Sequence, residues 1–494
     1  MDHYGIWSLV PPVLAIIIAI WTRQVYVSLF LGIWAGWLII DKGNILRGSM
    51  DTVQAFVDVF KDAGNTRTIM FGALVGALII FVQRSGGVQG FTDYISNLVK
   101  DYEKEGKGGP KRFLSILAWL AGVVVFVESS ISVLTIGALF RPLFDKFKIS
   151  REKLAYLADS SSAPTCILIP LNAWGAFIMG LLAAQGLERP FQFMISTIPY
   201  NLYPILALVL AFVVAFTGWN IGQMKQAERR VKETGALLNE GAQPVISQDV
   251  SEVKMKEGLK PRMINMLLPI ATMVLMMPVM LAYTGWGSTE NFNELGNGSK
   301  IITAIGGGSG STSVLIAVLS AIAMGIVLYS FQRMFSLAET VELMFKGISG
   351  LMPLALLMLF AFALSALCKE LGTGIFVAET AKTWLSPSLV PFLIFIVSAF
   401  IAFSTGTSWG TFAIMIPIAV PMAQSMDASL MLSVAAALGG GVFGDHSSPI
   451  SDTTILSSMA AATDHIDHVR TQLPYAMLAG TITALIYLVL GFLG

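Results

Sequence analysis

A polar run inside an apolar segment is the feature that most constrains this chain. The residues from Gly444 to Thr454, GDHSSPISDTT, interrupt a hydrophobic stretch that extends from about 431 to 462. A charged side chain within a bilayer costs roughly 2.5–3.5 kcal/mol, and Pro449 would leave backbone carbonyls without helical partners. Carboxylates, hydroxyls and freed carbonyls at one depth suit a small cation. The run therefore predicts half of a transport site.

The composition of the chain agrees with a membrane setting. Of the 494 residues, 55% are hydrophobic and 13% are charged, and the mean hydropathy is +0.73, whereas soluble domains carry about 25% charged residues. We therefore expect an all-α polytopic membrane protein, with the lipid bilayer as its surroundings, in the cell inner (cytoplasmic) membrane. The N-terminus lacks the basic region of a signal peptide, so the first apolar segment is expected to stay as a span.

Several classes of function lack support in the sequence. The net charge is zero, and no basic patch interleaved with aromatic residues indicates a nucleic-acid partner. Cys166 and Cys368 lie in separate apolar segments and predict neither a disulfide framework nor a zinc site. No phosphate-binding loop for ATP occurs. Because no nucleophile–base pairing is evident either, we expect neither an enzyme nor a bound cofactor beyond transported ions.

Twelve apolar segments divide the chain into two sets of six. They lie at about 6–21, 24–41, 68–84, 113–143, 154–183 and 198–217, and then at about 262–283, 312–330, 350–368, 388–422, 430–462 and 473–493. The polar stretch between the two sets alternates in charge and lacks an apolar core, as expected of a connector. The sequence thus predicts a first transmembrane repeat at 1–217, a connector at 218–261 and a second repeat at 262–494.

The two halves share a weak internal similarity. Phe126–Ser132 resembles Phe403–Trp409, and Asp159–Pro164 resembles Asp445–Pro449. Weak symmetry combined with interrupted hydrophobic segments in matching places indicates the binding site of a transporter built from inverted repeats. The fifth segment of each set, which contains the Ser-Pro sequence, is therefore expected to be a broken helix.

The fourth segments, 113–143 and 388–422, exceed the roughly 20 residues that one crossing needs. Each has a polar cluster near its middle, so we expect a re-entrant hairpin with the cluster at its tip; the alternative is a single long, tilted span. With hairpins, each half crosses five times and most of the 31 Lys and Arg gather on one side. The excess of positive charge on cytoplasmic loops favours this arrangement, with the connector in the cytoplasm and both termini outside.

The carboxylates, imidazole and hydroxyls of the polar run are the strongest site candidates: Asp445, His446, Ser448, Ser451 and Asp452. Asp445 and Asp452 would share one face of an unbroken helix, but Pro449 between them favours a broken one. We expect Asp445 and Asp452 to carry the coupling of ion and proton. The alternative is a polar loop outside the membrane in which Asp445 caps a helix.

Further candidates lie in the first half of the chain. Glu128 is the only carboxylate between Lys111 and Asp145, and a buried Glu suits a cation or a transferable proton; the alternative is a structural hydrogen bond. Asp159 would be the first-half counterpart of the polar run, unless it lies near the cytoplasmic end of its segment. The polar neighbours of the two acids complete this set: Ser129, Ser130, Ser161, Ser162 and Asn172.

Other polar and aromatic residues have weaker signals. Thr405 and Thr407 have no acid beside them, and hydroxyls in membrane helices often bond to their own backbone. Trp174 and Trp409 would close the site or serve as packing and interface anchors. The residues Asp464, His465, Asp467 and His468 have a metal-like spacing, but directly after an apolar run they are expected to form a solvated helix end.

The sequence FGDHSSPISDTTILSS, which begins at Phe443, resembles the signature of the NhaC family of sodium/proton antiporters, and the twelve-segment plan resembles that family over nearly the whole chain. The family belongs to the ion transporter superfamily, whose folds pair a scaffold with an elevator-type transport domain bearing two hairpins, and whose elevator members are usually homodimers. The resemblance implies an ion site at Asp445, Ser448, Ser451, Asp452 and Thr453, with sodium on the first four. Glu128 and Asp159 fit as first-half partners.

Two functions on one fold therefore remain open. The first is exchange of sodium ions for protons across the cytoplasmic membrane by alternating access. The second is sodium- or proton-coupled transport of a small organic acid or amino acid, whose carboxylate would rest on the hairpin-tip amides and hydroxyls. A channel would show a continuous polar stripe or rings of like charge, and the connector is too short for the signalling domain of a receptor.

Overall fold

A computed structural model describes residues 3–22, 24–104, 110–126, 128–244, 255–287, 297–381 and 385–493. Within these ranges the chain is helical, apart from loops and one isolated bridge between Pro244 and Asp464. The helices are η1 Gly5–Leu9, α1 Val10–Thr22, α2 Val25–Ile40, α3 Ile45–Val59, α4 Ala63–Arg84, α5 Gly87–Lys104, α6 Pro110–Val124, α7 Ser129–Lys146, α8 Arg151–Leu168, α9 Ala173–Ala184, α10 Pro190–Thr197, η2 Ile198–Tyr200, α11 Leu202–Thr217, α12 Gly222–Thr234, α13 Ile264–Thr284, α14 Asn297–Gly307, α15 Gly310–Phe331, α16 Leu337–Glu370, α17 Thr373–Ala381, η4 Pro387–Leu389, α18 Val390–Thr405, α19 Ser408–Met426, α20 Leu430–Ser447, α21 Asp452–Ala461 and α22 His465–Leu493.

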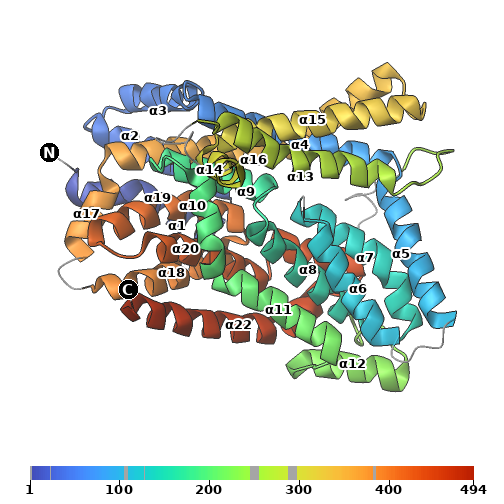
Figure 1. The fold of residues 1–494 in the computed structure, drawn as a ribbon. Coiled ribbons are helices and arrows are strands. Elements are labelled where there is room, and N and C mark those ends of the chain that lie inside the picture. Colours follow the sequence, from blue (N-terminus) through green and yellow to red (C-terminus); the bar gives the residue numbers. More distant parts are fainter. Residues whose placement is uncertain are drawn as a thin grey trace.

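The helices form two layers (Figure 1). One layer contains α2, α3, α4, α13, α15 and α16, in which α16 packs along α4 and α13 along α15. The other contains α6, α7, α8, α11, α18, α20 and α22, in which α18 packs along α20. Helices α1, α9 and α19 have contacts in both layers. Segments from the two halves of the sequence are therefore interleaved in each layer.

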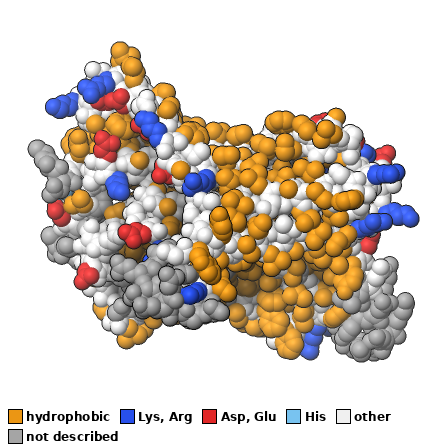
Figure 2. Space-filling view, turned by 45° about the horizontal axis from the view of Figure 1, so that its top comes forward, with side chains coloured by type: hydrophobic (Ala, Val, Ile, Leu, Met, Phe, Trp, Pro, Cys, Tyr) orange, Lys and Arg blue, Asp and Glu red, His pale blue; other side chains and the backbone are white. Residues whose placement is uncertain are grey.

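The surface of the protein is that of a multi-pass membrane protein. Among the described residues, eight helical stretches are long and apolar enough to cross a bilayer, and α8 with α9 forms a further candidate span that is bent by 43°. Figure 2 shows a broad band of hydrophobic side chains between two ends at which charged side chains gather. The all-α, multi-pass prediction is confirmed.

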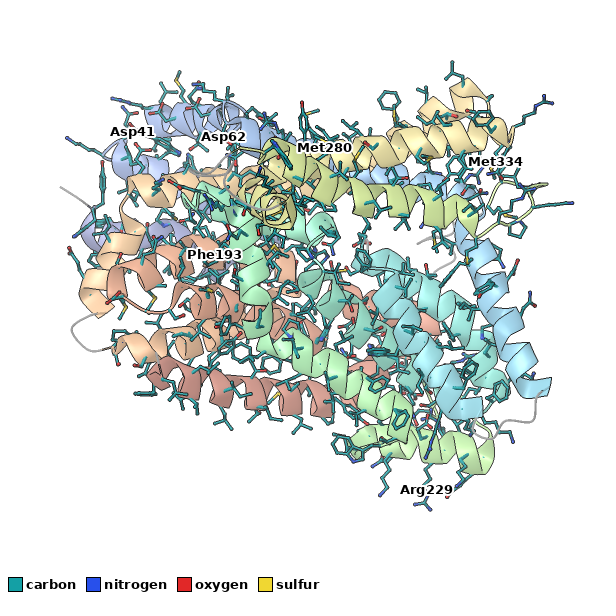
Figure 3. All side chains as sticks on the ribbon, in the orientation of Figure 1. Asp41, Asp62, Phe193, Arg229, Met280 and Met334 are labelled. Atoms are coloured by element: carbon teal, nitrogen blue, oxygen red, sulfur yellow. The ribbon has the colours of Figure 1, made fainter. Side chains whose placement is uncertain are left out.

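The two ends of the molecule differ in the segments that they carry. The C-terminal end of α22 lies with η1 and α17 at one end, and α12 of the connector lies at the other (Figure 1). Asp41 marks the first end, whereas Arg229 and Met334 mark the second (Figure 3). Which end faces the cytoplasm stays a prediction.

Helix α18 runs in the same direction as α20. Gly440 lies against the backbone of Phe395, and Gly444 lies one turn further along against Ala399. A side chain at either glycine would overlap the backbone of α18, so the glycines permit this close approach.

Helix α19 returns along α20 in the opposite direction. Ser408 at its beginning contacts Asp445, whereas Phe412 one turn later lies against Gly441, one turn earlier in α20. Helices α18 and α19 therefore form an antiparallel hairpin, and its turn is made by Gly406, whose φ is +70°.

Helices α6 and α7 form a second antiparallel hairpin. Lys111 Nζ donates to the carbonyl of Lys148, and Ser132 Oγ donates to the carbonyl of Gly122, so residues late in α7 meet residues early in α6. Gly122 lies directly against Ser161 of α8. Both hairpins fall on segments that the sequence singled out, and their re-entrance into a membrane stays a prediction.

Each hairpin packs on a helix that is interrupted. The chain breaks between α8 and α9 and again between α20 and α21, and the side chains of Asn172 and Ser451 cap the helices that follow. Pro164 lies inside α8, whereas Pro449 lies in the second break. The sequence pairing of these two prolines is therefore wrong, because the first break follows Pro164 by about a turn and depends on the Asn172 cap instead.

The connector is more ordered than its composition suggested. Its helix α12 buries Met224, Ala227 and Val231, which lie on one face and pack near α8 and α22. The connector was expected to lack an apolar core, and its helix α12 nevertheless buries one face, because three small or apolar positions at helical spacing suffice when charges occupy the other faces. Residues 245–254 of the connector lie outside the described residues.

Candidate functional site

The break between α20 and α21 separates the two aspartates of the polar run. Asp445 lies in the last turn of α20 and is 0% exposed, whereas Asp452 is the first residue of α21 and is exposed. The Thr453 backbone N–H donates to Asp452 Oδ1 over 2.8 Å. A negative side chain in the first turn of a helix is stabilised by the helix dipole. The break thus buries one carboxylate and leaves the other exposed.

Asp445 has one satisfied and one unsatisfied carboxylate oxygen. Ser408 Oγ donates to its Oδ2 over 2.7 Å. Its Oδ1 has no hydrogen-bond partner among the described residues. A buried polar atom without a partner costs about 1–3 kcal/mol, and more if it is charged. Oδ1 of Asp445 is therefore available to a bound ion or proton.

Asp159 of α8 brings the first half of the chain to the same region. Its Oδ2 accepts hydrogen bonds from Thr454 Oγ1 over 3.2 Å and from Gln472 Nε2 over 2.6 Å, and His468 Nε2 lies 3.7 Å away. Its Oδ1 has no partner among the described residues. Asp159 is 0% exposed, so the alternative that it lies at a solvated helix end is wrong.

Glu128 completes a group of four carboxylates. It precedes α7 at the tip of the first hairpin, it is 9% exposed, and Ser129 Oγ donates to its Oε1 over 3.2 Å. Asp452 lies close enough to Glu128 and Asp159 for their charges to interact, and Asp445 lies similarly close to Asp452. The structure therefore brings together the four carboxylates that the sequence singled out.

Positive side chains do not neutralise the three aspartates. In the described part of the chain, none of Asp159, Asp445 and Asp452 forms an ion pair with a lysine or arginine; His468 is the imidazole nearest to Asp159. Neighbouring buried carboxylates cannot all remain charged without a cation or a proton. The arrangement suits a site that holds exchangeable positive charge.

The hydroxyls of the site fall into two groups. Those within α8 and α18 donate to carbonyls of their own helix: Ser161, Ser162, Thr165 and Thr405. Ser451 and Thr453 instead lie with their hydroxyls 3.2 Å apart at the start of α21, beside Asp452. Thr407 caps α19. The side chain of Ser130 lies outside the described residues.

A backbone carbonyl near the tip of each hairpin accepts a hydrogen bond from a residue of the neighbouring helix break. Asn172 Nδ2 donates to the carbonyl of Phe126 over 3.1 Å, and Ser448 Oγ donates to the carbonyl of Phe403 over 2.6 Å. Phe126 and Phe403 are the residues that the internal similarity paired. Ser448 thus holds the hairpin in place, and its hydroxyl proton is not free for another partner.

His446 points away from the break. Its side chain is 1% exposed, its Nδ1 lies 3.2 Å from the hydroxyl of Tyr203 in α11, and its Nε2 has no partner among the described residues. Its carbonyl accepts a hydrogen bond from Gln472. His446 therefore contributes to the site through its backbone and its burial rather than as a neighbour of Asp452.

Comparison with known proteins identifies the family. Residues 183–492 match the model of the Na⁺/H⁺ antiporter family. The chain belongs to the Na⁺/H⁺ antiporter family. The resemblance of the polar run to sodium/proton antiporters is thereby confirmed, and this antiporter-family protein is a secondary transporter.

The relatives of this chain have different names. An uncharacterized protein of Haemophilus influenzae is 33% identical over 99% of this chain and 91% of its own length. The malate-2H⁺/Na⁺-lactate antiporter of Bacillus subtilis is 32% identical over 22% of this chain and 27% of its own. The arginine/ornithine antiporter ArcD of Halobacterium salinarum is 30% identical over 30% of this chain and 32% of its own.

Two solved transporters share the fold of this antiporter-family protein. The YdaH transporter of Alcanivorax borkumensis superimposes with a TM-score of 0.57 over 90% of this chain and 89% of its own, at 15% identity. MtrF of Neisseria gonorrhoeae superimposes with a TM-score of 0.56 over 90% of this chain and 84% of its own, also at 15% identity. These likenesses concern the fold alone.

Sequence reasoning missed part of the site in this antiporter-family protein. The run from Asp464 to His468 was expected to form a solvated helix end, but His468 is 0% exposed. That interpretation was wrong for His468 because α22 begins at His465 and turns this side chain inward, toward Asp159. The signal was present: His468 and Gln472 are one turn apart, on the face that also buries Tyr475.

An aromatic cluster lies between the hairpin tip and α9. The ring centroids of Trp174 and Trp409 are 5.0 Å apart, and those of Phe177 and Trp409 are 5.1 Å apart. Trp409 follows Ser408 at the beginning of α19, and Trp174 follows the Asn172 cap of α9 by one residue. The cluster covers one side of the region in which the two breaks meet.

Metal-binding side chains do not cluster in the part of the chain that the structure describes. No group of three or more His, Cys, Asp or Glu there could hold a metal ion together. A sodium site would instead draw on hydroxyl and carbonyl oxygens beside carboxylates. Those oxygens are present at the two helix breaks.

Proposed function

We propose that this protein exchanges sodium ions for protons across the membrane by alternating access. The observation that carries the proposal is Asp445, a fully buried carboxylate whose Oδ1 has no partner and which lies close to Asp452 and Asp159. Such a carboxylate is uncharged or bound to a cation. Exchange of one state for the other is antiport.

Asp445 and Asp452 are proposed to bind sodium together with hydroxyl and carbonyl oxygens of the break. Asp452 is exposed and therefore meets the arriving ion, and Asp445 receives it in the interior. Ser451 lies near Asp445 and caps α21, the helix that begins with Asp452, so its hydroxyl lies between the two carboxylates in the chain. Ser448 supports the site by holding the hairpin, and Thr453 does so through its backbone bond to Asp452.

Competition between sodium and protons for the negative charge of this group of carboxylates would couple the two fluxes. A nearby cation favours the charged form of a carboxylate, whereas burial favours the protonated form. Because the carboxylates lie close together, their proton equilibria are expected to be linked rather than separate. The layer formed by the hairpins and broken helices is proposed to move against the layer of α4 and α16, as an elevator-type transport domain moves against its scaffold.

Sodium-dependent collapse of an imposed pH gradient in proteoliposomes tests the proposal. The purified protein is expected to move protons when sodium is added, and Asp452→Asn, which keeps the side-chain volume, is expected to abolish this movement. Normal sodium-driven proton movement by Asp452→Asn would remove Asp452 from the site. No proton movement by folded wild-type protein would reject sodium–proton exchange.

An organic solute is the second candidate cargo. The aromatic cluster of Trp174 and Trp409 beside the hairpin tip favours it, and the names of two relatives mention organic acids and amino acids. Thermal unfolding with malate, lactate, arginine or ornithine, each with and without sodium, tests this candidate. A sodium-dependent rise in the unfolding temperature would support it, and no shift with any of the four would count against it.

The assembly and placement of the protein are further proposals. We propose a homodimer in the inner membrane, with the segments at 6–41 and 262–330 at the interface and the connector in the cytoplasm. Cross-linking between copies through single cysteines in the 24–41 segment tests the dimer. Labelling of a cysteine in α12 from one side of the membrane tests the orientation.

A further inference from the structure

Asp159 and His468 form a buried pair that lies apart from Asp445 and Asp452. Both side chains are 0% exposed, and His468 Nε2 lies 3.7 Å from Asp159 Oδ2 and 3.2 Å from Ser457 Oγ. The hydroxyl of Ser457 already donates to the carbonyl of Thr453 over 2.7 Å. The Nε2 of His468 therefore carries the hydrogen of the Ser457 contact, and the same nitrogen lies within ion-pair distance of the Asp159 carboxylate.

Asp159 is tied to both sides of the second break. Thr454, on α21, donates to Asp159 Oδ2, and so does Gln472 on α22. The same Gln472 nitrogen also donates to the carbonyl of His446 on α20, over 2.9 Å. A change of charge at Asp159 therefore acts on the two helices that carry Asp445 and Asp452.

Unsatisfied atoms point to a bound proton. Asp159 Oδ1 and His468 Nδ1 are buried and have no partner among the described residues. A carboxylate and a neutral imidazole together carry one negative charge. One added proton, held by either group, leaves the pair with zero net charge and removes the cost of an uncompensated buried charge.

We propose that Asp159 and His468 form a proton-binding site that is distinct from the sodium site at Asp445 and Asp452. The proposal rests on the sodium–proton exchange proposed above. The proton adds to the carboxylate–imidazole pair from one side of the membrane and leaves it toward the other, and no covalent bond other than that to the proton forms or breaks. Gln472 is a positioning residue, because it aligns Asp159 through its amide.

The titratable groups that face the pair come from each neighbouring helix. They are Tyr203 on α11, Asp445 and His446 on α20, Asp452 on α21, and His465 on α22. The negative charge of Asp159 acts on both Asp445 and Asp452. A proton on the pair therefore weakens the local negative potential that attracts sodium, and sodium at the break likewise opposes the proton, which is the exclusion that antiport requires.

Two transport assays in proteoliposomes separate the sites. The first is exchange of labelled sodium for unlabelled sodium at equal pH on both sides, which needs no proton movement. The second is sodium-driven proton movement. His468→Gln is expected to keep sodium–sodium exchange and to lose at least about tenfold in proton movement, the effect of a one-unit change in proton affinity. Asp159→Asn is expected to lose the same proton movement and also to weaken sodium–sodium exchange, because its charge acts on Asp445 and Asp452.

His465→Gln is the matched control. His465 lies one turn before His468 and also contacts a hydroxyl of α21, with Ser458 Oγ 3.0 Å from its Nδ1. In the described part of the chain it forms no hydrogen bond or ion pair with Asp159, and it is half-buried. This variant is expected to keep both activities. Loss of proton movement in both single variants, His465→Gln and His468→Gln, would overturn the proposal, because the effect would then not be specific to Asp159 and His468.

The remaining outcomes are equally decisive. Unchanged proton movement in both His468→Gln and Asp159→Asn would overturn the separate proton site and leave the exchange itself intact. Loss of both assays in His468→Gln would also overturn it, because His468 would then serve folding or translocation as a whole. A wild-type protein without sodium exchange would instead reject the proposed function.

Discussion

Ser408 and Asp445 are 37 positions apart in the sequence and are joined by a hydrogen bond of 2.7 Å between Ser408 Oγ and Asp445 Oδ2. Ser408 begins α19, and Asp445 lies in the last turn of α20. The carboxylate is therefore held by the hairpin that packs against its helix and not by its own helix. A movement of the hairpin tip would change the environment of Asp445 directly.

Ser408→Ala is expected to weaken the apparent affinity for sodium. A hydrogen bond to a charged group contributes about 1.5–3 kcal/mol, which corresponds to about 10- to 100-fold in affinity, and its loss favours the protonated carboxylate over the sodium-bound one. The sodium concentration that gives half-maximal proton movement measures this effect. Ser408→Thr keeps the hydroxyl and is the control. An unchanged sodium dependence in Ser408→Ala would show that this bond does not support the site.

Gly406→Ala is expected to disturb the hairpin more than Gly218→Ala disturbs the end of α11. Both glycines have a positive φ, of +70° and +73°, and each substitution costs about 1 kcal/mol for the left-handed backbone. At Gly406 an added Cβ would also overlap the backbone of Ile450, whereas at Gly218 nothing lies within 4 Å. Thermal unfolding temperatures and proton movement measure the difference. Equal losses in the two variants would contradict the close contact at the hairpin turn.

Asn172→Ala is expected to destabilise the first break. Its Nδ2 donates to the carbonyl of Phe126, and its Oδ1 accepts from the backbone N–H of Gly175 over 3.0 Å. Loss of a cap costs about 1 kcal/mol, and an unsatisfied buried carbonyl costs about 1–3 kcal/mol more. Asn172→Ser keeps a capping oxygen and loses the amide donor, so its unfolding temperature is expected to lie between those of wild type and Asn172→Ala. An unfolding temperature below that of Asn172→Ala would contradict this order.

The docking of the connector is expected to depend on pH through Asp464. Burial would raise the pKa of Asp464, but the backbone N–H groups of Gln243, Asp467 and Ile466 outweigh it and hold the pKa below its ordinary value of 3.8. A carboxyl group whose pKa is lowered in the folded state stabilises that state above its ordinary pKa, and this stabilisation is lost as the pH falls through the folded-state pKa.

Asp464→Asn is therefore expected to loosen residues 239–244 at neutral pH and to differ less from wild type at about pH 3, where the pH is below the ordinary pKa of an aspartate and the stabilisation is partly lost. Hydrogen exchange of this segment at the two pH values measures the effect. Asp93→Asn is the control. Asp93 lies in α5, which contacts the first hairpin, and this change is expected to leave the exchange of residues 239–244 unchanged. Equal protection in Asp464→Asn and wild type at neutral pH would exclude Asp464 as the anchor.

The sequence identified the carboxylates of the site better than it identified the residues that contact them. Asp445, Asp452, Glu128 and Asp159 stand out because carboxylates inside apolar segments are costly, and the structure brings all four together. The role of His468 was missed because the run from Asp464 reads as a polar end, although His468 lies one turn before Gln472 on a face that also buries Tyr475. The pairing of Pro164 with Pro449 failed for a related reason. Helix α8 continues through Pro164 without a break, and the local sequence does not indicate this.

The sequence by itself determined that this protein is a helical membrane protein with polar breaks at matching places, because the cost of charges and free backbone groups in lipid is local to each segment. Only the tertiary structure decided which oxygens meet. Ser408 reaches Asp445, Asn172 reaches Phe126 and His468 approaches Asp159 across separate helices. Those contacts depend on glycine-permitted packing and on helix direction, which act between segments and leave no local pattern in the chain.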